Sequence, residues 1–430
     1  MTKLTEFIGI KDRIEEDWTF AGEDTRYMTH GFHLYPARMM PLIAKRLIRR
    51  FAQSQDDVIL DPFVGSGGVL VEARLHNRNA VGVDINPLAI LIARAKTQPI
   101  DPKVLREHAR KLFRRTEKDV LEKVDYGVPD IKNVKFWFKT PIIRKLNIIR
   151  HHLDDLKAVD ENVYDFFACA FSYAVRKTSS VRPREYKLYR IADDELPTHN
   201  PDVLAVFREI VDKNISKMHD YYNAVKGFDV RTSLLEGDTR RLNEINPLIL
   251  HDECASLVVT SPPYGDAHTT VAYGQFSRYP ALWLGFDEEK VLDLDDTGLG
   301  GQSIESDVSS LDSATLTETF EKVKERDEVR AKELLAFFYD IDLCMKQIGR
   351  ALRGGRSHCC FVLGNRTMRR VKIPADRILI EMSRKHAYQH VETKYRDIPT
   401  KRIPWVNAPE NVPGRTVETM AKESIIIWSL

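Results

Sequence analysis

Short runs of apolar residues alternate with amphipathic stretches in the first part of the chain. Residues 58–61 and 80–84 have the length and composition of buried strands, and each is followed by helical apolar spacing, at 69–76 and 87–96. Residues 41–51 form a further amphipathic stretch upstream. This order predicts the front half of a doubly wound α/β domain.

The same rhythm returns in the second half of the chain. Residues 316–352 have the period of one or two long helices. Apolar runs predict further strands at 230–238, 256–260, 358–363, 391–398 and 424–430. With the two upstream runs, they predict one α/β sheet of seven strands.

The region between these halves has a different pattern. Residues 100–228 are charged, aromatic and helical in period, with no convincing strand, and are interpreted as a helical insertion. Residues 265–320 contain clusters of Gly, Asp and Ser and are predicted to be a long loop. The expected organisation is therefore a front half at 1–99 that begins with an irregular arm, the insertion, and a back half at 229–430.

Composition and charge are those of an ordinary globular protein. The chain has 430 residues, 43% of them hydrophobic and 30% charged, and its formal net charge is +2. The five cysteines form no CxxC pair, which argues against a disulfide framework or a zinc site and for reduced thiols in a cytoplasmic protein. The charged N-terminus is not a signal peptide, and no apolar run reaches the roughly 18 residues of a membrane span.

The first motif with chemical meaning is a glycine-containing turn directly after a predicted strand. Residues 61–67 read Asp-Pro-Phe-Val-Gly-Ser-Gly. Glycines at this position allow the backbone to approach a ligand closely, and the helix that follows offers free N–H groups. A nucleotide-like cofactor is the expected occupant. NAD is disfavoured because the chain continues Gly-Val-Leu and lacks the third glycine of the GxGxxG fingerprint.

The second motif is Asp84, at the end of the second predicted strand. An acid there typically binds the hydroxyl groups of a ribose. The alternative is a helix N-terminus, because Asn86-Pro87 also has the sequence of a helix start. The glycine turn about 20 residues upstream favours ribose binding.

The third motif, Ser261-Pro262-Pro263-Tyr264, follows the apolar run 256–260. Two prolines fix the backbone and remove two N–H donors, so the carbonyl groups are left as acceptors. The Ser261 oxygen and the Pro262 carbonyl are suited to accept both hydrogens of an amino group, and Tyr264 is suited to stack on a flipped-out base. The bland alternative is a proline-rich surface turn. The position after a strand, downstream of a glycine turn and an acid, favours the functional interpretation.

In combination, these motifs resemble the amino-methyltransferase family of DNA methylases. The resemblance implies S-adenosylmethionine as cofactor, a Rossmann-like class I methyltransferase sheet with its last strand antiparallel, and roles for the matching residues. Phe63, Gly65 and Gly67 would bind the methionine part of the cofactor, Asp84 its ribose, and Ser261 to Tyr264 the target amino group. It also makes 1–99 the cofactor-binding half and 229–430 the catalytic half.

Further segments extend the resemblance to nearly the whole chain. Residues 29–37 resemble the segment that covers the methionine end of the cofactor, and 270–278, 397–404 and 411–414 also match. Asp238 resembles the acid that contacts the adenine amino group, although a strand-end turn is the alternative. Helical residues Phe167, Phe171, Ser172 and Arg176 fit a recurring pattern of the insertion. The complete set of expected cofactor residues is Tyr35, Pro36, Asp61, Pro62, Phe63, Gly65, Ser66, Gly67, Asp84, Ile85 and Asp238.

Two basic and aromatic clusters are candidates for nucleic-acid contacts. One lies at residues 176–190 and the other near Trp405, and ordinary solvated surface is the alternative for both. The predicted contact residues are Arg176, Arg182, Arg184, Lys187, Arg190, Lys401 and Arg402. Either the insertion or the segment 265–320 is the expected target-recognition region.

The expected activity is methyl transfer to the N4 amino group of cytosine in double-stranded DNA, by base flipping and direct attack, without a metal. Serine at the first motif position is usual for cytosine N4 and aspartate for adenine N6. Adenine N6 in DNA, and N4 of cytidine or N2 of guanosine in RNA, are the alternatives. A cognate restriction endonuclease is a further candidate partner. A non-enzymatic nucleic-acid binder is disfavoured by the intact motifs, and an NAD oxidoreductase leaves the Ser-Pro-Pro-Tyr motif unexplained.

Overall fold

The computed structural model describes residues 17–183, 185–265, 271–302, 304, 307–398, 406–407, 417–418 and 422–430. In these residues, seven strands form one sheet in the order β3-β2-β1-β4-β5-β11-β8. Neighbouring strands are parallel except at β11, which is antiparallel to both β5 and β8. The strands are β1 (Val58–Asp61), β2 (Asn79–Asp84), β3 (Thr232–Glu236), β4 (Leu257–Thr260), β5 (His358–Gly364), β8 (Gln389–Asp397) and β11 (Lys422–Ser429). The predicted sheet and its antiparallel last strand are confirmed.

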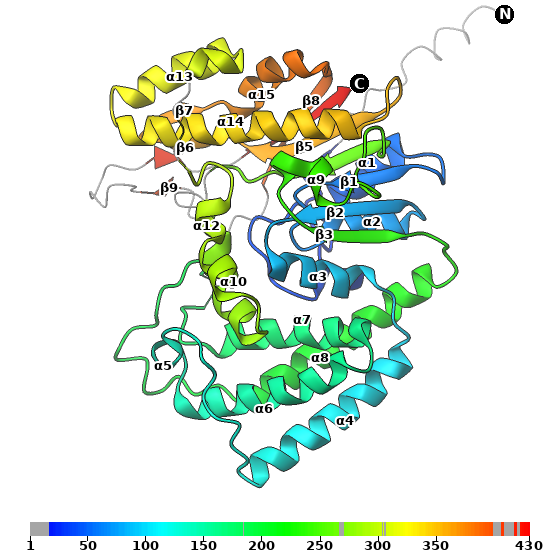
Figure 1. Ribbon diagram of the computed structural model, residues 1–430, viewed down its shortest axis with the longest axis vertical. Coiled ribbons are helices and arrows are strands. Elements are labelled where there is room, and N and C mark those ends of the chain that lie inside the picture. Colours follow the sequence, from blue (N-terminus) through cyan, green and yellow to red (C-terminus); the bar gives the residue numbers. More distant parts are fainter. Residues whose placement is uncertain are drawn as a thin grey trace, which may run out of the picture.

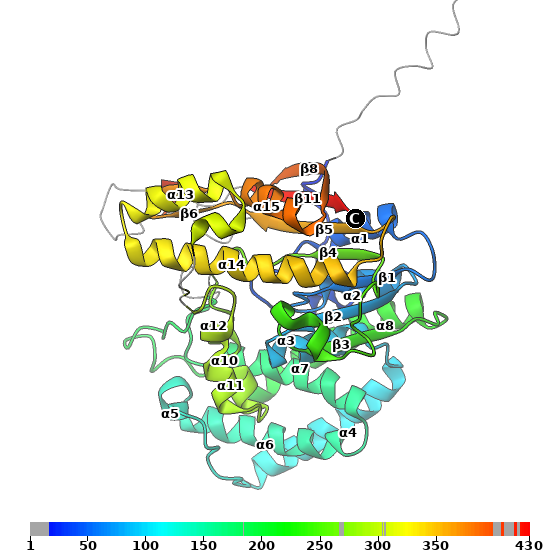
Figure 2. The same cartoon turned by 45° about the horizontal axis from the view of Figure 1, so that its top comes forward.

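Both faces of the sheet are covered by helices, which explains why its central strands are continuously apolar. Side chains of successive residues point to opposite faces, so Ile59 packs with α1 (Pro41–Phe51) and α2 (Gly68–Leu75), whereas Leu60 packs on the other side. That other face is covered by α13 (Ala314–Lys324), α14 (Glu328–Ala351) and α15 (Ala375–Ser383). Figure 2 shows α14 running along the sheet beneath α13 and α15.

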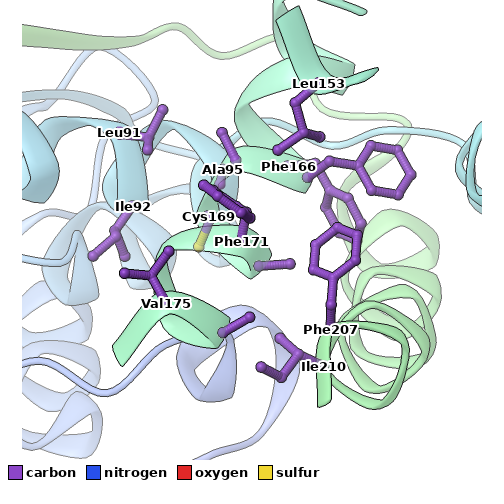
Figure 3. Packing of buried hydrophobic residues seen from close by; sticks show 14 of the residues in the cluster. Leu91, Ile92, Ala95, Leu153, Phe166, Cys169, Phe171, Val175, Phe207 and Ile210 are labelled. Carbon is purple, nitrogen blue, oxygen red and sulfur yellow. The ribbon is translucent and has the colours of Figure 1, made fainter. Parts of the chain in front are cut away.

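The region 100–228 forms a separate layer of helices below the sheet (Figure 1). It contains α4 (Pro102–Leu121), α5 (Val134–Trp137), α6 (Thr140–Lys157), α7 (Glu161–Thr178) and α8 (Val203–Val225). Its central helix, α7, packs on α3 (Pro87–Thr97) of the sheet domain as well as on α6 and α8. Figure 3 shows Cys169 and Phe171 of α7 between Leu91 and Ile92 of α3 and Phe207 of α8.

The segment 265–320 corrects a prediction, because its described residues are largely helical. It contains α10 (Tyr273–Trp283), α11 (Glu288–Leu292), α12 (Leu294–Thr297) and a 3₁₀ turn, η3 (Val308–Leu311). Gly, Asp and Ser clusters indicated a loop, but tertiary burial outweighs that local preference. Phe276 and Trp283 of α10 are completely buried in the core shared with α7, and the helix continues through Pro280. Together α10 to α12 stand between the insertion and α14 (Figure 1).

Smaller elements complete the described chain. They are η1 (Met28–Gly31), η2 (Thr239–Arg241), α9 (Leu242–Ile245), η4 (Arg384–His386), the antiparallel pair β6 (Arg366–Met368) and β7 (Val371–Ile373), and the antiparallel pair β9 (Val406–Asn407) and β10 (Val417–Glu418). No described helix is both long enough and apolar enough to cross a membrane.

Candidate active site

The site forms where the strand order changes direction. From β1 the chain continues outward to β2 and β3 on one side of the sheet, and β4 and β5 follow on the other side. The carboxyl ends of β1 and β4 therefore flank the crevice in which α/β sheets bind ligands. A pocket opens there. It brings together most of the predicted site residues: Tyr35, Pro36, Asp61, Pro62, Phe63, Gly65, Ser66, Asp84, Ile85, Asp238, Ser261 and Pro263. Gly67, Pro262 and Tyr264 are not on the wall formed by the described residues.

The glycine turn is fixed to the acid that follows the second strand. Gly65 has a φ of +46°, and its N–H donates a hydrogen bond of 2.8 Å to Asp84 Oδ2. The Val64 N–H donates to the Val83 carbonyl at 2.9 Å. The turn after β1 is therefore held against the end of β2, and this contact forms one wall of the pocket.

Gly67 serves the packing of helices and not the pocket wall. Its φ is +80°, and a Cβ there would lie 2.9 Å from both Cα and Cβ of Ala93 in α3. Glycine is required because it is the residue that adopts this backbone conformation and also allows so close an approach. The cofactor contact of Gly67 stays a prediction, and the structure places this residue off the pocket wall, at the N-cap of α2.

Asp84 is joined to a buried polar network that the sequence did not reveal. Asn86 is the N-cap of α3, and its N–H donates to Asp84 Oδ1 at 2.9 Å. Its side-chain amide donates to the Tyr35 hydroxyl at 3.1 Å and to the Ser277 hydroxyl at 2.7 Å. Asn86 was considered only as part of a helix start, a role it does have, yet it also lines the pocket. Burial raises the pKa of Asp84 to about 6.

Asp61 connects the ends of β1 and β4. Its Oδ1 accepts hydrogen bonds from the Thr260 hydroxyl at 2.6 Å and from the Phe63 N–H at 3.2 Å. Burial raises the pKa of Asp61 to about 7, because those hydrogen bonds only partly compensate for its removal from water. The pocket thus has two carboxyl groups at the ends of adjacent strands, Asp61 buried and Asp84 half-buried.

Asp238 lies on the pocket wall but is paired within the protein. Arg240 donates to Asp238 Oδ2 at 2.7 Å, to Asp340 Oδ2 at 2.9 Å and to the Thr297 carbonyl at 2.7 Å. Arg240 also lines the pocket and was missed, because a single arginine in a turn carries no sequence signal of its own. Tyr273 is another missed wall residue, and its ring centroid lies 6.1 Å from that of Tyr35. It belongs to the segment 270–278, which the family resemblance had marked.

The Ser-Pro-Pro-Tyr motif follows the carboxyl end of β4, which is next to β1 in the sheet. Ser261 and Pro263 face the pocket, whereas Tyr264 packs against the core of the sheet. The Ser261 hydroxyl donates to the Tyr264 hydroxyl at 3.4 Å, and the Tyr264 hydroxyl donates to Glu423 Oε1 at 3.0 Å. Burial, together with the Glu423 carboxylate, raises the pKa of Tyr264 well above its usual value, so this hydroxyl stays protonated.

The predicted nucleic-acid residues fall into three groups. The Arg176 side chain makes contacts within the protein: its guanidinium lies 4.2 Å from the centroid of the Phe276 ring and donates to the Phe276 carbonyl. A second group lies on a hairpin-like loop, which is closed by an antiparallel bridge between Val181 and Arg190 and contains Arg182, Lys187 and Arg190. Arg184, Lys401 and Arg402 lie outside the described residues.

Among the described residues, one group has the composition of a metal site. His151, His152 and Asp155 of α6 present ligand atoms within 4.8 Å of one another. None of the three lines the pocket, and Arg115 donates to Asp155 at 2.6 Å. Nothing connects this group to the chemistry of the pocket.

The pocket suits a nucleoside cofactor that carries several hydrogen-bond donors. In the described part of the chain, the buried Ser66 hydroxyl on the pocket wall has no hydrogen-bond partner. The Asp84 carboxylate accepts hydrogen bonds from the backbone N–H groups of Gly65 and Asn86. Its acceptor lone pairs at the end of β2 suit ribose hydroxyl groups. With the sheet order and the glycine turn, these features define a class I methyltransferase.

Comparison with known proteins identifies the family within that class. Residues 11–95 match the family described as DNA methylase. The type II methyltransferase M.MvaI of Kocuria varians is 36% identical over 426 residues, which are 95% of this chain and 92% of that protein. The chain belongs to the family of DNA amino-methyltransferases, and its methyl donor is S-adenosylmethionine.

Two other matches are partial or weak. A tRNA (guanine(10)-N2)-dimethyltransferase of Methanothermobacter thermautotrophicus is 37% identical over 99 residues, covering 22% of this chain and 28% of that protein. The solved structure of the rRNA methyltransferase aviRa from Streptomyces viridochromogenes aligns over 92% of this chain and 88% of its own, with a TM-score of 0.31 and 8% identity. The low TM-score makes this a weak structural likeness.

Proposed function

We propose that the protein methylates the exocyclic N4 amino group of cytosine in duplex DNA at a specific sequence. The observation that carries the proposal is one pocket whose wall includes both Asp84 with the glycine turn and Ser261 with Pro263. A cofactor and an amino group can therefore meet inside it. Serine at the first position of the motif supports cytosine N4 over adenine N6, for which aspartate is usual.

The cofactor end is assigned by hydrogen-bonding capacity. Asp84 is proposed to accept the ribose hydroxyls, and Ser66 and the glycine turn to contact the methionine part, with Tyr35 and Pro36 covering it. Asp238 is proposed to accept the adenine amino group while Arg240 holds its carboxylate in place. S-adenosylmethionine supplies an electrophilic methyl group on a sulfonium.

At the other end, the motif is proposed to hold the target amino group. The Ser261 oxygen and the Pro262 carbonyl would accept its two hydrogens and turn the nitrogen lone pair toward the methyl group. The base would reach this position by flipping out of the duplex, since N4 of a stacked cytosine cannot enter a pocket at the edge of a sheet. Direct attack needs no covalent enzyme intermediate.

Contacts to DNA are proposed for the insertion and the elements beside it. Arg182, Lys187 and Arg190 lie near two exposed aromatic residues, Phe136 and Tyr189, each with half of its surface exposed. Arg190 lies 4.4 Å above the Phe136 ring. Cations interleaved with aromatic rings suit phosphate contacts and stacking. A cognate restriction endonuclease and a cytoplasmic location remain part of the proposal.

The test is methyl transfer from labelled S-adenosylmethionine to duplex DNA and to total RNA, followed by nucleoside mass spectrometry. N4-methylcytosine in DNA, lost in Ser261→Ala, is the expected product. N6-methyladenine in DNA, or label in RNA alone, would overturn the proposed base or nucleic acid.

A further inference from the structure

The hydroxyl groups of the Ser-Pro-Pro-Tyr motif lead away from the pocket to a carboxylate on the last strand. Ser261 donates to Tyr264 at 3.4 Å and Tyr264 donates to Glu423 Oε1 at 3.0 Å. Arg396 of β8 donates to the other oxygen, Glu423 Oε2, at 3.0 Å. A continuous chain therefore joins a pocket residue to an ion pair behind the pocket.

The antiparallel direction of β11 explains why Glu423 is at this place. In the sheet, Glu423 is paired with Gly364 at the carboxyl end of β5 and with Arg396 in β8. Because β11 runs against its neighbours, its first residues lie at the same edge as the carboxyl ends of the parallel strands. A parallel strand would present its last residues there and would carry Glu423 to the opposite edge.

The carboxylate is held firmly. Arg396 is buried, and its guanidinium also donates to the Thr19 carbonyl, so its side chain has a fixed position. Among the described residues, the side chains hydrogen-bonded to Glu423 are Arg396 and Tyr264, and the facing position on β5 is a glycine. Asp17 also interacts electrostatically with Arg396.

We propose that Glu423, acting through Tyr264, supplies the charge that the serine of the motif lacks and receives the proton released by methylation. The proposal rests on the proposed function, because it assigns Ser261 to the target amino group. Glu423 is a positioning residue in this scheme, since it touches neither base nor cofactor.

The electrostatic reason is that a neutral hydroxyl is a weaker acceptor than a carboxylate. Hydrogen bonds in a chain polarise one another, and those that end on an ionised group are the strong ones. A Ser261 hydroxyl that donates into a chain ending on Glu423 becomes a better acceptor for the amino hydrogen. The 3.4 Å separation of Ser261 and Tyr264 is long, but catalytic hydrogen bonds commonly shorten when substrate binds.

The same chain of hydrogen bonds accepts the proton that the reaction releases. Methyl transfer forms an N–C bond, breaks the S–C bond and leaves a neutral sulfide and a positively charged amino nitrogen. That nitrogen loses one proton to the Ser261 oxygen as the Ser261 proton passes to Tyr264 and the Tyr264 proton passes to Glu423. Glu423 ends as a carboxylic acid, and its side chain, which is 16% exposed, returns the proton to solvent.

The experiment compares Glu423→Gln, Tyr264→Phe and the double variant with the native enzyme, in single-turnover methylation of a cytosine-containing duplex. Glutamine still accepts a hydrogen bond from Arg396, so the sheet edge is retained. Each single variant is expected to lose about 100-fold in rate, the lower end of the effect of general acid–base groups. The double variant is expected to lose no more than either single one, because both break the same chain.

Two further measurements separate this role from a structural one. S-adenosylmethionine affinity and thermal stability should both remain native in Glu423→Gln, so that the loss falls on the single-turnover rate alone. Glu392→Gln is the matched control, because Glu392 is also an ion-paired glutamate in the antiparallel part of this sheet, with Arg50 as partner. Native rates in both Glu423→Gln and Tyr264→Phe, or additive losses in the double variant, would overturn the relay. Failure of the proposed function is distinct, because the native enzyme would then make no N4-methylcytosine.

Discussion

At the residue scale, the pocket depends on two carboxyl groups with raised pKa values, one buried and one half-buried. Asp61 and Asp84 follow adjacent strands, and burial raises the pKa of the first to about 7 and of the second to about 6. Such a shift means that the folded protein binds protons that the unfolded chain releases. The stability of the unliganded protein therefore falls as the pH rises from about 4 through these values.

Cofactor affinity is expected to have the opposite pH dependence. In the proposed assignment, ribose hydroxyls donate to an ionised Asp84, so binding must expel its proton below a pH of about 6. We expect affinity for S-adenosylmethionine to fall by up to about tenfold per pH unit below that value and to level off above it. Titration calorimetry between pH 5 and pH 8 measures this. Asp84→Asn should bind weakly with a flatter profile, and an unchanged profile would contradict the assignment.

A site residue could be predicted from the sequence where it directly follows the apolar run that identifies a strand. Asp61, Asp84 and Ser261 follow apolar runs directly, so the sequence places them at the carboxyl ends of strands. Glu423 could not be found this way, because it precedes the apolar part of its strand and reaches the site through the antiparallel direction of β11. Asn86 was hidden by its ordinary role as a helix cap.

At the scale of elements, the contact between α2 and α3 sets the geometry of the glycine turn. Gly67 makes this contact possible, and Gly68 one residue later offers a matched comparison, since a Cβ at Gly68 would have no atom within 4 Å. We expect Gly67→Ala to lower the free energy of unfolding by about 1–3 kcal/mol through overpacking and to weaken cofactor binding. Gly68→Ala should leave the free energy of unfolding near native, and the comparison is made on stability because Gly68 itself lines the pocket. Chemical denaturation and calorimetry test the pair, and equal effects would exclude the packing explanation.

The helices α10 to α12 show the limit of local pattern. Gly, Asp and Ser clusters argued for a loop over 265–320. The helix forms because Phe276 and Trp283 enter the core built by α7, a contact with residues far away in the sequence. The strands and α1, by contrast, were predictable because their apolar spacing alone determines them.

At the scale of the whole molecule, DNA binding depends on how charged side chains are distributed over the surface, because the net charge is only +2. We expect the double variant Arg182→Ala, Lys187→Ala to bind specific and non-specific duplexes more weakly by similar factors. The slope of log affinity against log salt should decrease by about one for each phosphate-binding side chain that is removed. Cofactor affinity should be unchanged, and Lys213→Ala, which removes an exposed lysine of α8, is the control. A native slope in the double variant would exclude a role for these two side chains in phosphate binding.

The packing of α7 against α3 has a consequence for any exchange of the helical insertion between relatives. The insertion shares its hydrophobic core with three residues of α3, Leu91, Ile92 and Ala95. The boundary of the packed unit is therefore not at the two ends of the inserted segment. A chimera cut at those ends would place a foreign α7 on a mismatched α3. Because α3 begins at the Asn86 cap on the pocket wall, that mismatch would reach the cofactor. A graft that carries the insertion together with the outward face of α3 is the unit that can be exchanged.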